Sequence, residues 1–378
     1  MDFLHGLRVV EPANEQEVSA ALVCANRDGL AVVPRGGGTK LEWGNPPARA
    51  GLILSTARLN RIVEHAWADL TVTVEAGCTV ADLQRALAVR GQRLALDALW
   101  TERATVGGIL SANDSGALRL TYGGLRDLII GITLVLADGT IARSGGKVVK
   151  NVAGYDLPKL ATGALGTLGV ITQAIFRLHP LPRNTRTLTL DCADIDSAQA
   201  LLLTLQGSNV AHTALQVRLG GSMAPKMDIL LEGTDAGMEA QEARIRGLAR
   251  VTLIEKGDTS IWRAREELTA GGAFSKLSVL PANIATTVSA IERTGDPEWY
   301  AVFYANGIGW LSLNAPLNEL RVEVEAGGGS LFVLRRSPAQ ARMDTWGETG
   351  DALPLMRAIK SQFDPNGTLN PGRFAGGI

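Results

Sequence analysis

The sequence predicts an α+β protein with two domains, of which the second carries an antiparallel sheet. The first hundred residues order their elements as helix, strand, glycine-rich loop, two strands and helix, not in the strict alternation of a doubly wound parallel sheet. Prolines then interrupt the chain at His179-Pro180-Leu181-Pro182, where we place a domain boundary. Beyond it, strands and helices alternate over 185–345, which is typical of an antiparallel sheet covered by helices on one face.

The predicted first domain, 1–180, begins with an amphipathic helix over 15–29. Thr79 is a suitable N-cap for a second helix over 80–90. Strands are expected at 31–33, 51–55, 70–75, 125–136, 139–144 and 169–178. The segment 145–166 combines turn signals with apolar residues, and long irregular segments of this kind are usually functional.

The predicted second domain, 181–345, contains two kinds of periodic segment. Helices are expected at 197–205, 236–249 and 317–326. Strands are expected at 187–190, 214–219, 227–232, 300–304, 309–313 and 330–334. A last helix, over about 352–363, precedes Asp364-Pro365-Asn366-Gly367, which is a strong turn signal. Residues 346–378 therefore form a separate C-terminal segment.

Composition and charge exclude several classes of protein. The 378 residues are 46% hydrophobic and 20% charged, as in ordinary globular proteins, and a formal charge of −1 excludes a nucleic-acid binder that acts through bulk charge. The longest apolar run, 128–137, is too short to cross a bilayer and predicts a buried strand, so no transmembrane segment is expected. The N-terminus shows no secretory signal.

Cysteine and histidine are too scattered to predict a metal centre. The three cysteines, Cys24, Cys78 and Cys192, form neither a disulfide framework nor a ligand set for zinc or an iron–sulfur cluster. This favours a reducing compartment, and we expect a cytoplasmic location. The four histidines stand far apart in the sequence, so no metal site is expected.

The most informative motif is the loop Pro34-Arg35-Gly36-Gly37-Gly38-Thr39, which follows an apolar strand. Glycines have no side chain to pack, but they leave their amides accessible and permit positive φ, so such a loop forms a concave nest for an anion. We expect positive φ at Gly37, with its α-carbon facing a diphosphate. A glycine-rich surface turn is the alternative. Neither a Walker loop nor a G-x-G-x-x-G motif at the start of a helix is present.

Two further glycine-rich regions, 104–116 and 163–172, follow this loop. Together with Tyr122-Gly123, the strand end Ala137-Asp138-Gly139-Thr140 and the tail Phe363 to Gly372, they resemble the FAD-binding oxidoreductases of the vanillyl-alcohol oxidase, or PCMH-type, fold. The resemblance covers about 1–180 and 350–378. It implies an FAD-binding domain of two α+β subdomains, a smaller cap or substrate domain with an antiparallel sheet, and a C-terminal segment that returns to the flavin.

The same resemblance implies which residues contact FAD. The implied residues are Pro34, Arg35, Gly36, Gly37, Gly38, Thr39, Thr105, Gly107, Gly108, Ser111, Asn113, Ser115, Gly116, Gly166, Gly169, Val170, Ile171 and Asn370. Close packing is the alternative explanation for Gly107-Gly108. Residues 40–50 contain no histidine or cysteine that would tether a flavin, so we expect non-covalent FAD. Leu165 stands where relatives carry an acidic residue.

The segment Lys147 to Leu157 and the short length of the chain resemble more closely the E subunits of bacterial glycolate oxidases. This implies an FAD-binding subunit of an enzyme that oxidises glycolate, a small 2-hydroxy acid, to glyoxylate. Its partners would be a larger FAD-containing glycolate oxidase subunit and an iron–sulfur subunit. Any peripheral association with a membrane would occur through these partners.

Catalytic residues are not assigned from the sequence. Lys150, Tyr155 and Asp156 lie in a motif expected to border the flavin, but turn or packing roles explain them equally well. Relatives that oxidise 2-hydroxy acids carry a histidine-rich metal cluster, whereas 181–345 contains only His212. Two alternatives remain open. One is a self-sufficient FAD-dependent oxidoreductase of 2-hydroxy acids or alcohols, and the other is a non-catalytic assembly subunit that has lost FAD.

Overall fold

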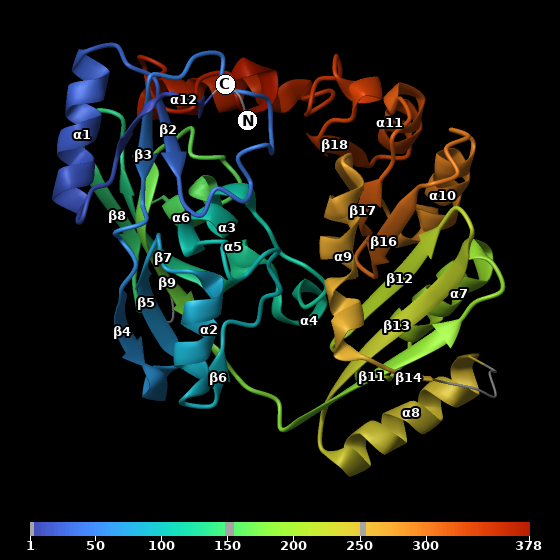
Figure 1. Ribbon diagram of the computed structural model, residues 1–378. Coiled ribbons are helices and arrows are strands. Elements are labelled where there is room, and N and C mark those ends of the chain that lie inside the picture. Colours follow the sequence, from blue (N-terminus) through green and yellow to red (C-terminus); the bar gives the residue numbers. More distant parts are fainter. Residues whose placement is uncertain (1–3, 148–154, 250–254) are drawn as a thin grey trace. The chain divides into compact units, whose positions relative to one another are not determined.

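The computed structural model describes residues 4–147, 155–249 and 255–378. These residues form two compact units (Figure 1). The first unit comprises the described parts of 1–115, 122–181 and 348–378, and the second comprises 116–121 and the described parts of 182–347. In the part of the chain that the structure describes, no helix has both the length and the apolar character that a membrane span requires.

A three-stranded parallel sheet opens the first unit. Its strands are β1 (Arg8–Val10), β3 (Leu52–Ser55) and β2 (Val32–Arg35), in that order across the sheet. Helix α1 (Glu15–Arg27) begins at Asn14, whose side-chain oxygen accepts a hydrogen bond from the amide of Glu17 at 2.9 Å. The apolar face of α1, which carries Val18 and Leu22, packs on the parallel sheet.

An antiparallel five-stranded sheet forms the rest of the first unit, in the order β4-β5-β9-β7-β8. Its strands are β4 (Ile62–Ala66), β5 (Thr71–Glu75), β7 (Ile129–Val135), β8 (Ile141–Gly145) and β9 (Val170–Arg177). Four helices share a core with it: α2 (Val80–Ala88), α3 (Val106–Ala112), α5 (Leu125–Leu128) and α6 (Leu157–Ala161). The paired strands β6 (Gln92–Arg93) and β10 (His179–Pro180) also belong to this unit, whereas the short helix α4 (Arg119–Tyr122) falls mainly in 116–121, which belong to the second unit.

The two sheets of the first unit are joined by a common apolar cluster. Val135 of β7 and Val170 of β9 pack with Val32 of β2 and Leu54 of β3, and all four side chains are almost fully buried. Burial of apolar surface on this scale fixes the relative position of the strands that contribute it. The end of β2, where the glycine loop begins, is therefore held beside the start of β9.

The structure corrects several expected elements. The strand expected over 125–136 begins with the helical turn α5, because the amide of Gly124 donates to Oδ2 of Asp127 at 2.8 Å and starts that turn. The segment 145–166, expected to be irregular, contains helix α6. Strands β1 and β4 and helix α3 were not expected. The residues of β4 are half-buried or exposed, and such an edge strand gives no strong apolar alternation.

The second unit is built on one eight-stranded antiparallel sheet of order β14-β11-β13-β12-β16-β17-β15-β18, which confirms the expected sheet type. The strands are β11 (Asn184–Asp191), β12 (Ala214–Gly220), β13 (Met223–Gly233), β14 (Glu255–Gly257), β15 (Phe274–Ser278), β16 (Tyr300–Tyr304), β17 (Ile308–Ser312) and β18 (Ser330–Arg335). Four helices pack on one face: α7 (Ile195–Gln206), α8 (Asp235–Ala249), α10 (Ile284–Glu292) and α11 (Asn318–Ala326). Strands β14 and β15 and helix α10 were not expected.

The opposite face of the eight-stranded sheet carries polar and aromatic side chains. Asp228 is fully buried there and accepts hydrogen bonds from Thr189, Gln216 and Arg218. Arg265, on the short helix α9 (Ala264–Glu267), lies over the ring of Trp310 with 4.7 Å between its Cζ and the ring centroid. Short helical segments thus cover part of this face too, which corrects the expectation of helices on one face alone.

The three cysteines are expected to differ sharply in reactivity. Cys24 is exposed, whereas Cys78 and Cys192 are buried, and burial raises the pKa of each buried thiol to about 11. Because the thiolate is the nucleophile, a maleimide reagent at neutral pH should label Cys24 alone in the native chain and all three cysteines after unfolding. Peptide mass spectrometry checks this, and rapid labelling of native Cys78 would contradict the packing described.

Candidate functional site

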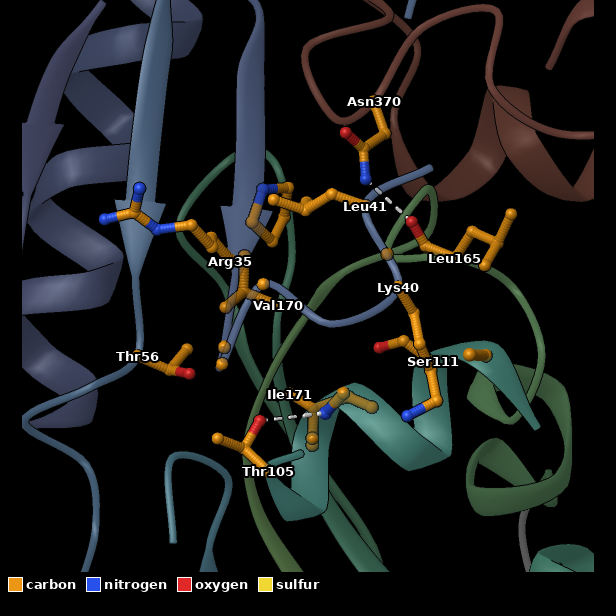
Figure 2. A pocket seen from close by; sticks show the side chains of 18 of the residues that line it. Arg35, Lys40, Leu41, Thr56, Thr105, Ser111, Leu165, Val170, Ile171 and Asn370 are labelled. Atoms are coloured by element: carbon orange, nitrogen blue, oxygen red, sulfur yellow. Dashed lines mark hydrogen bonds between the residues drawn. The ribbon is translucent and has the colours of Figure 1, made fainter. Parts of the chain in front are cut away.

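A pocket in the first unit is bordered by the glycine loop and by segments from three other parts of the chain (Figure 2). The loop itself, at the end of β2, forms one wall, and α3 forms the next. The turn before β9 forms a third wall. The fourth comes from the C-terminal segment that follows α12 (Leu353–Phe363).

The glycine loop presents a run of backbone donors to this pocket. Among the described residues, none supplies a hydrogen-bond acceptor to the amides of Gly36, Gly37, Gly38 or Thr39. All four residues line the pocket. Successive amides that surround one hollow form the kind of nest that binds an anion, because each N–H directs its partial positive charge inward. The loop therefore has the geometry and the unused donors of an anion site.

The glycines of the loop also serve a packing purpose that the sequence analysis missed. A Cβ at position 37 would lie 1.7 Å from the carbonyl oxygen of Arg103, and one at position 36 would lie 2.1 Å from Oγ1 of Thr105. Positive φ was expected at Gly37, but among the three glycines only Gly38 has it, at 73°. Glycine is required at 36 and 37 because the loop lies directly on the segment before α3.

Helix α3 begins where this segment meets the loop. Thr105 is its N-cap, and the hydroxyl oxygen accepts a hydrogen bond from the amide of Gly108 at 3.3 Å. A Cβ at Gly107 would lie 2.8 Å from the Cβ of Ala76. Gly107 therefore has the close-packing role that the sequence left open as an alternative, while it also lines the pocket.

The wall before β9 combines strained backbone with an apolar surface. Leu165 and Asn370 both have positive φ, at 50° and 43°, although neither is glycine. Nδ2 of Asn370 donates to the carbonyl oxygen of Leu165 at 2.7 Å (Figure 2). Leu165, Val170 and Ile171 are buried hydrophobic residues that line the pocket. Backbone strain of this kind is concentrated at ligand sites, where the surrounding structure maintains it.

A buried lysine stands directly after the glycine loop. Nζ of Lys40 lies 3.0 Å from Oδ2 of Asp114, and the side chains are 5% and 0% exposed. The same ammonium lies 5.2 Å from the ring centroid of Trp100 and 5.6 Å from that of Trp43. Oδ2 of Asp114 also accepts from the amide of Leu99 at 2.9 Å. In Figure 2, Lys40 extends toward the helix that carries Ser111. This ion pair ties the loop to the residues that flank α3.

A second cation, Arg373, lines the pocket from the C-terminal segment. The residue is 3% exposed, and its guanidinium donates to the carbonyl oxygens of Lys40, Leu41 and Trp43. Burial lowers the pKa of Arg373 to about 10, so the group stays protonated at neutral pH. Arg373 thus fixes the chain just after the glycine loop and adds positive charge to the pocket wall.

The C-terminal segment connects two walls of the pocket. The amide of Val32 in β2 donates to the carbonyl of Thr368 at 2.7 Å, and the amide of Asn370 donates to the carbonyl of Val32 at 3.0 Å. Nζ of Lys360 donates to the carbonyl of Thr167 at 2.7 Å and to Oδ2 of Asp364 at 2.6 Å. The segment therefore holds β2 and the turn before β9 in a fixed relation.

The structure brings most of the expected site residues to this one pocket. Those that line it are Pro34, Arg35, Gly36, Gly37, Gly38, Thr39, Thr105, Gly107, Gly108, Ser111, Gly166, Gly169, Val170, Ile171 and Asn370. Three others are not among its lining residues: Asn113, Ser115 and Gly116. Asn113 instead ends α3, with a φ of 48°.

Sequence reasoning missed several lining residues and misplaced others. The missed ones are Lys40, Leu41, Thr56, Ala112, Leu165 as a wall residue, and Arg373. Lys40 and Arg373 each adjoin a motif that was recognised, and that adjacency was the available signal. Tyr155 is 89% exposed and Asp156 caps α6, so neither lines this pocket. Lys150 lies outside the described residues.

The pocket suits FAD on the chemistry of its groups. A diphosphate needs several donors and positive charge, which the loop amides and Arg373 supply. A flat ring needs apolar walls, which Leu165, Val170 and Ile171 supply. FAD also carries N–H and O–H donors, and Oδ1 of Asn370 is a buried acceptor with no hydrogen-bond partner among the described residues. An unsatisfied acceptor in a pocket wall is expected where a ligand completes the site.

Comparison with known proteins gives the same assignment. Residues 7–145 match the family model described as an FAD binding domain, and 345–374 match that of the FAD linked oxidases, C-terminal domain. The chain is 37% identical to glycolate oxidase subunit GlcD of Bacillus subtilis, over 97% of this chain and 88% of that protein. It is 28% identical to D-2-hydroxyglutarate dehydrogenase of Xanthomonas citri, over 97% and 89% of the two chains.

A solved structure shows the same fold. The crystal structure of p-cresol methylhydroxylase with substrate bound superposes with a TM-score of 0.77, over 97% of this chain and 88% of that one, at 18% sequence identity. At this identity the likeness shows the fold alone. The sequence matches carry the assignment further than the fold, and the chain belongs to the FAD-linked oxidase family of FAD-dependent oxidoreductases, with the fold of p-cresol methylhydroxylase.

Proposed function

We propose that this chain is an FAD-carrying subunit of a multi-subunit oxidoreductase that converts a small 2-hydroxy acid, glycolate, to the 2-oxo acid. The observation that carries the proposal is the row of four unused amides, Gly36 to Thr39, in a pocket whose other walls come from the family's remaining motifs. The similarity to the glycolate oxidase subunit and to the D-2-hydroxyglutarate dehydrogenase supports a 2-hydroxy acid as substrate.

The residues of the pocket would bind and orient the cofactor. The loop amides would hold the diphosphate, with Arg373 close by as a positive charge. The apolar wall at Leu165 and Val170 would exclude water from one face of the ring. Bound flavin would supply the acceptor for the two electrons that leave the substrate with two protons. Among the lining residues that the structure describes there is no histidine or cysteine, which supports a non-covalent cofactor.

The second unit supports a division of labour between subunits. Its sequence contains one histidine, His212, whose Nδ1 lies 3.0 Å from the carbonyl oxygen of Val210. Within the described ranges, no cluster of three or more His, Cys, Asp or Glu residues is arranged to hold a metal ion. We therefore assign substrate chemistry mainly to a larger FAD-containing subunit, and the exit of electrons to an iron–sulfur subunit.

Purification of the chain alone and together with these two partners tests the proposal. The chain alone should bind about one FAD and show the flavin absorption bands, but it should not oxidise glycolate with an artificial electron acceptor. Activity should appear when the partners are present, and a chain with Gly37 replaced by valine serves as the FAD-free control. Full turnover by the isolated chain would refute the division of labour. A colourless chain that takes up no FAD would refute the cofactor assignment.

A further inference from the structure

The side chain of Asn370 uses only one end of its carboxamide within the protein. The residue is 1% exposed and lines the pocket. Its Nδ2 donates to the carbonyl oxygen of Leu165 at 2.7 Å, whereas Oδ1 is buried and has no hydrogen-bond partner among the described residues. Buried polar atoms in native proteins nearly always have a partner, so an unpaired acceptor on a pocket wall indicates a ligand that donates to it.

One side-chain and one backbone hydrogen bond fix the orientation of this carboxamide. Exchange of its O and N positions would bring Oδ1 against the carbonyl oxygen of Leu165, which is also an acceptor, so the observed orientation is the one that chemistry allows. The backbone is held as well, because the amide of Asn370 donates to Val32 at 3.0 Å. Oδ1 therefore cannot turn to find another partner.

Local backbone strain and a nearby glycine also indicate a built site. Asn370 and Leu165 hold positive φ at 43° and 50°, and their hydrogen bond joins the two strained positions. A Cβ at Gly166 would lie 3.3 Å from Nδ2 of Asn370 and 3.5 Å from Cγ of Pro34. Glycine at 166 thus leaves room for the carboxamide of Asn370 and for the apolar ring of Pro34.

We propose that Oδ1 of Asn370 accepts a hydrogen bond from an N–H at the edge of a flat ring of FAD, and that this contact selects the cofactor. The inference rests on the proposed binding of FAD. The surroundings favour a ring, because Pro34, Leu165 and Gly166 offer apolar or bare backbone surface to a flat group. FAD has two such donors, N3–H of the flavin ring and the amino group of adenine, and the experiment distinguishes them.

The test measures the affinity of the apoprotein for FAD and for two analogues by quenching of flavin fluorescence. One analogue is methylated at N3 of the flavin, and the other carries purine, which lacks the amino group, in place of adenine. Removal of the contacted donor should weaken binding to the native chain by a factor of about ten or more, and the analogue affected identifies the ring. If both analogues bind within about twofold of FAD, the inference is overturned.

A variant of Asn370 distinguishes a hydrogen bond to FAD from a role limited to holding the backbone of Leu165 in place. Asn370→Gly removes the side chain and tolerates positive φ, so it should bind FAD more weakly and lose the discrimination against the affected analogue. Asn366→Gly is the matched control, because Asn366 is exposed in the same segment and outside the pocket, and it should keep the native discrimination. If Asn370→Gly weakens FAD and the analogue by the same factor, Asn370 only supports Leu165 and the inference is overturned.

The native-chain measurement decides the matter even where Asn370→Gly does not fold. A native chain that binds FAD without discriminating either analogue overturns this inference alone. A native chain that binds no FAD overturns the proposed function, and this inference with it.

Discussion

Replacement of Lys40 by methionine is expected to destabilise the protein by about 3–5 kcal/mol, because it leaves the carboxylate of Asp114 buried without its cation. Both side chains are almost inaccessible to solvent, at 5% and 0%, and the ammonium lies 3.0 Å from the carboxylate. The midpoint of thermal unfolding should fall by on the order of 10 °C. FAD binding should weaken as well, since the pair holds the glycine loop to the residues around α3. Calorimetry and FAD titration check both effects.

Two comparisons test the cause of this loss. The double variant Lys40→Met with Asp114→Asn should recover most of the stability, because the asparagine is neutral and its side-chain oxygen still accepts from the amide of Leu99. Lys226→Met is the matched control, since the pair of Lys226 with Asp191 is solvent-exposed and its loss should cost less than about 1 kcal/mol. Equal losses for the two single variants would contradict the role given to burial.

Gly37→Val is expected to reduce the affinity for FAD by a factor of about 100 or more, or about 2.7 kcal/mol. The new Cβ would lie 1.7 Å from the carbonyl oxygen of Arg103 and 2.8 Å from its carbon, so the loop must move away from this segment. The four amides would then no longer surround one hollow. The FAD content of the purified variant and a titration of its apoprotein measure the loss.

A glycine elsewhere in the chain provides the control for this substitution. At Gly247, in α8, no atom of the described residues outside the adjoining backbone of that helix lies within 4 Å of an added Cβ. Gly247→Ala should therefore leave FAD binding unchanged, and it should raise stability by about 0.5–1 kcal/mol because alanine is the better helix former. Retention of stoichiometric FAD by Gly37→Val would show that the loop is not the diphosphate site.

The sequence predicts where the glycine loop of the pocket lies, but it does not predict why position 37 must be glycine. A run of three glycines is a local signal, and the loop at 34–39 does line the pocket. The expected reason was wrong for Gly37, because its close approach to Arg103 depends on a segment distant in the sequence. The same limit applies to Lys40, whose burial depends on Asp114, and no pattern within either segment shows that the two meet.

Segments whose own sequence favours a strand were predicted, whereas a segment that becomes a strand through pairing with distant residues was not. Strand β16 was expected with the bounds it has, Tyr300–Tyr304, because its apolar run is continuous and buried. Strand β15 was not expected, because Phe274–Ser278 has no clear alternation and becomes a strand through its pairing with β17 and β18. Asn370 was identified only by the resemblance, and the unused acceptor of its side chain became visible only in the structure.

The assignment of this pocket to FAD depends on one contact, the binding of the cofactor's diphosphate by the amides of Gly36 to Thr39. A crystal structure of the chain with FAD bound tests it most directly. We expect diphosphate oxygens within hydrogen-bond distance of these amides, with a ring of the cofactor against Leu165 and Val170. A diphosphate held elsewhere in the chain, with these amides still unpaired, would contradict the account.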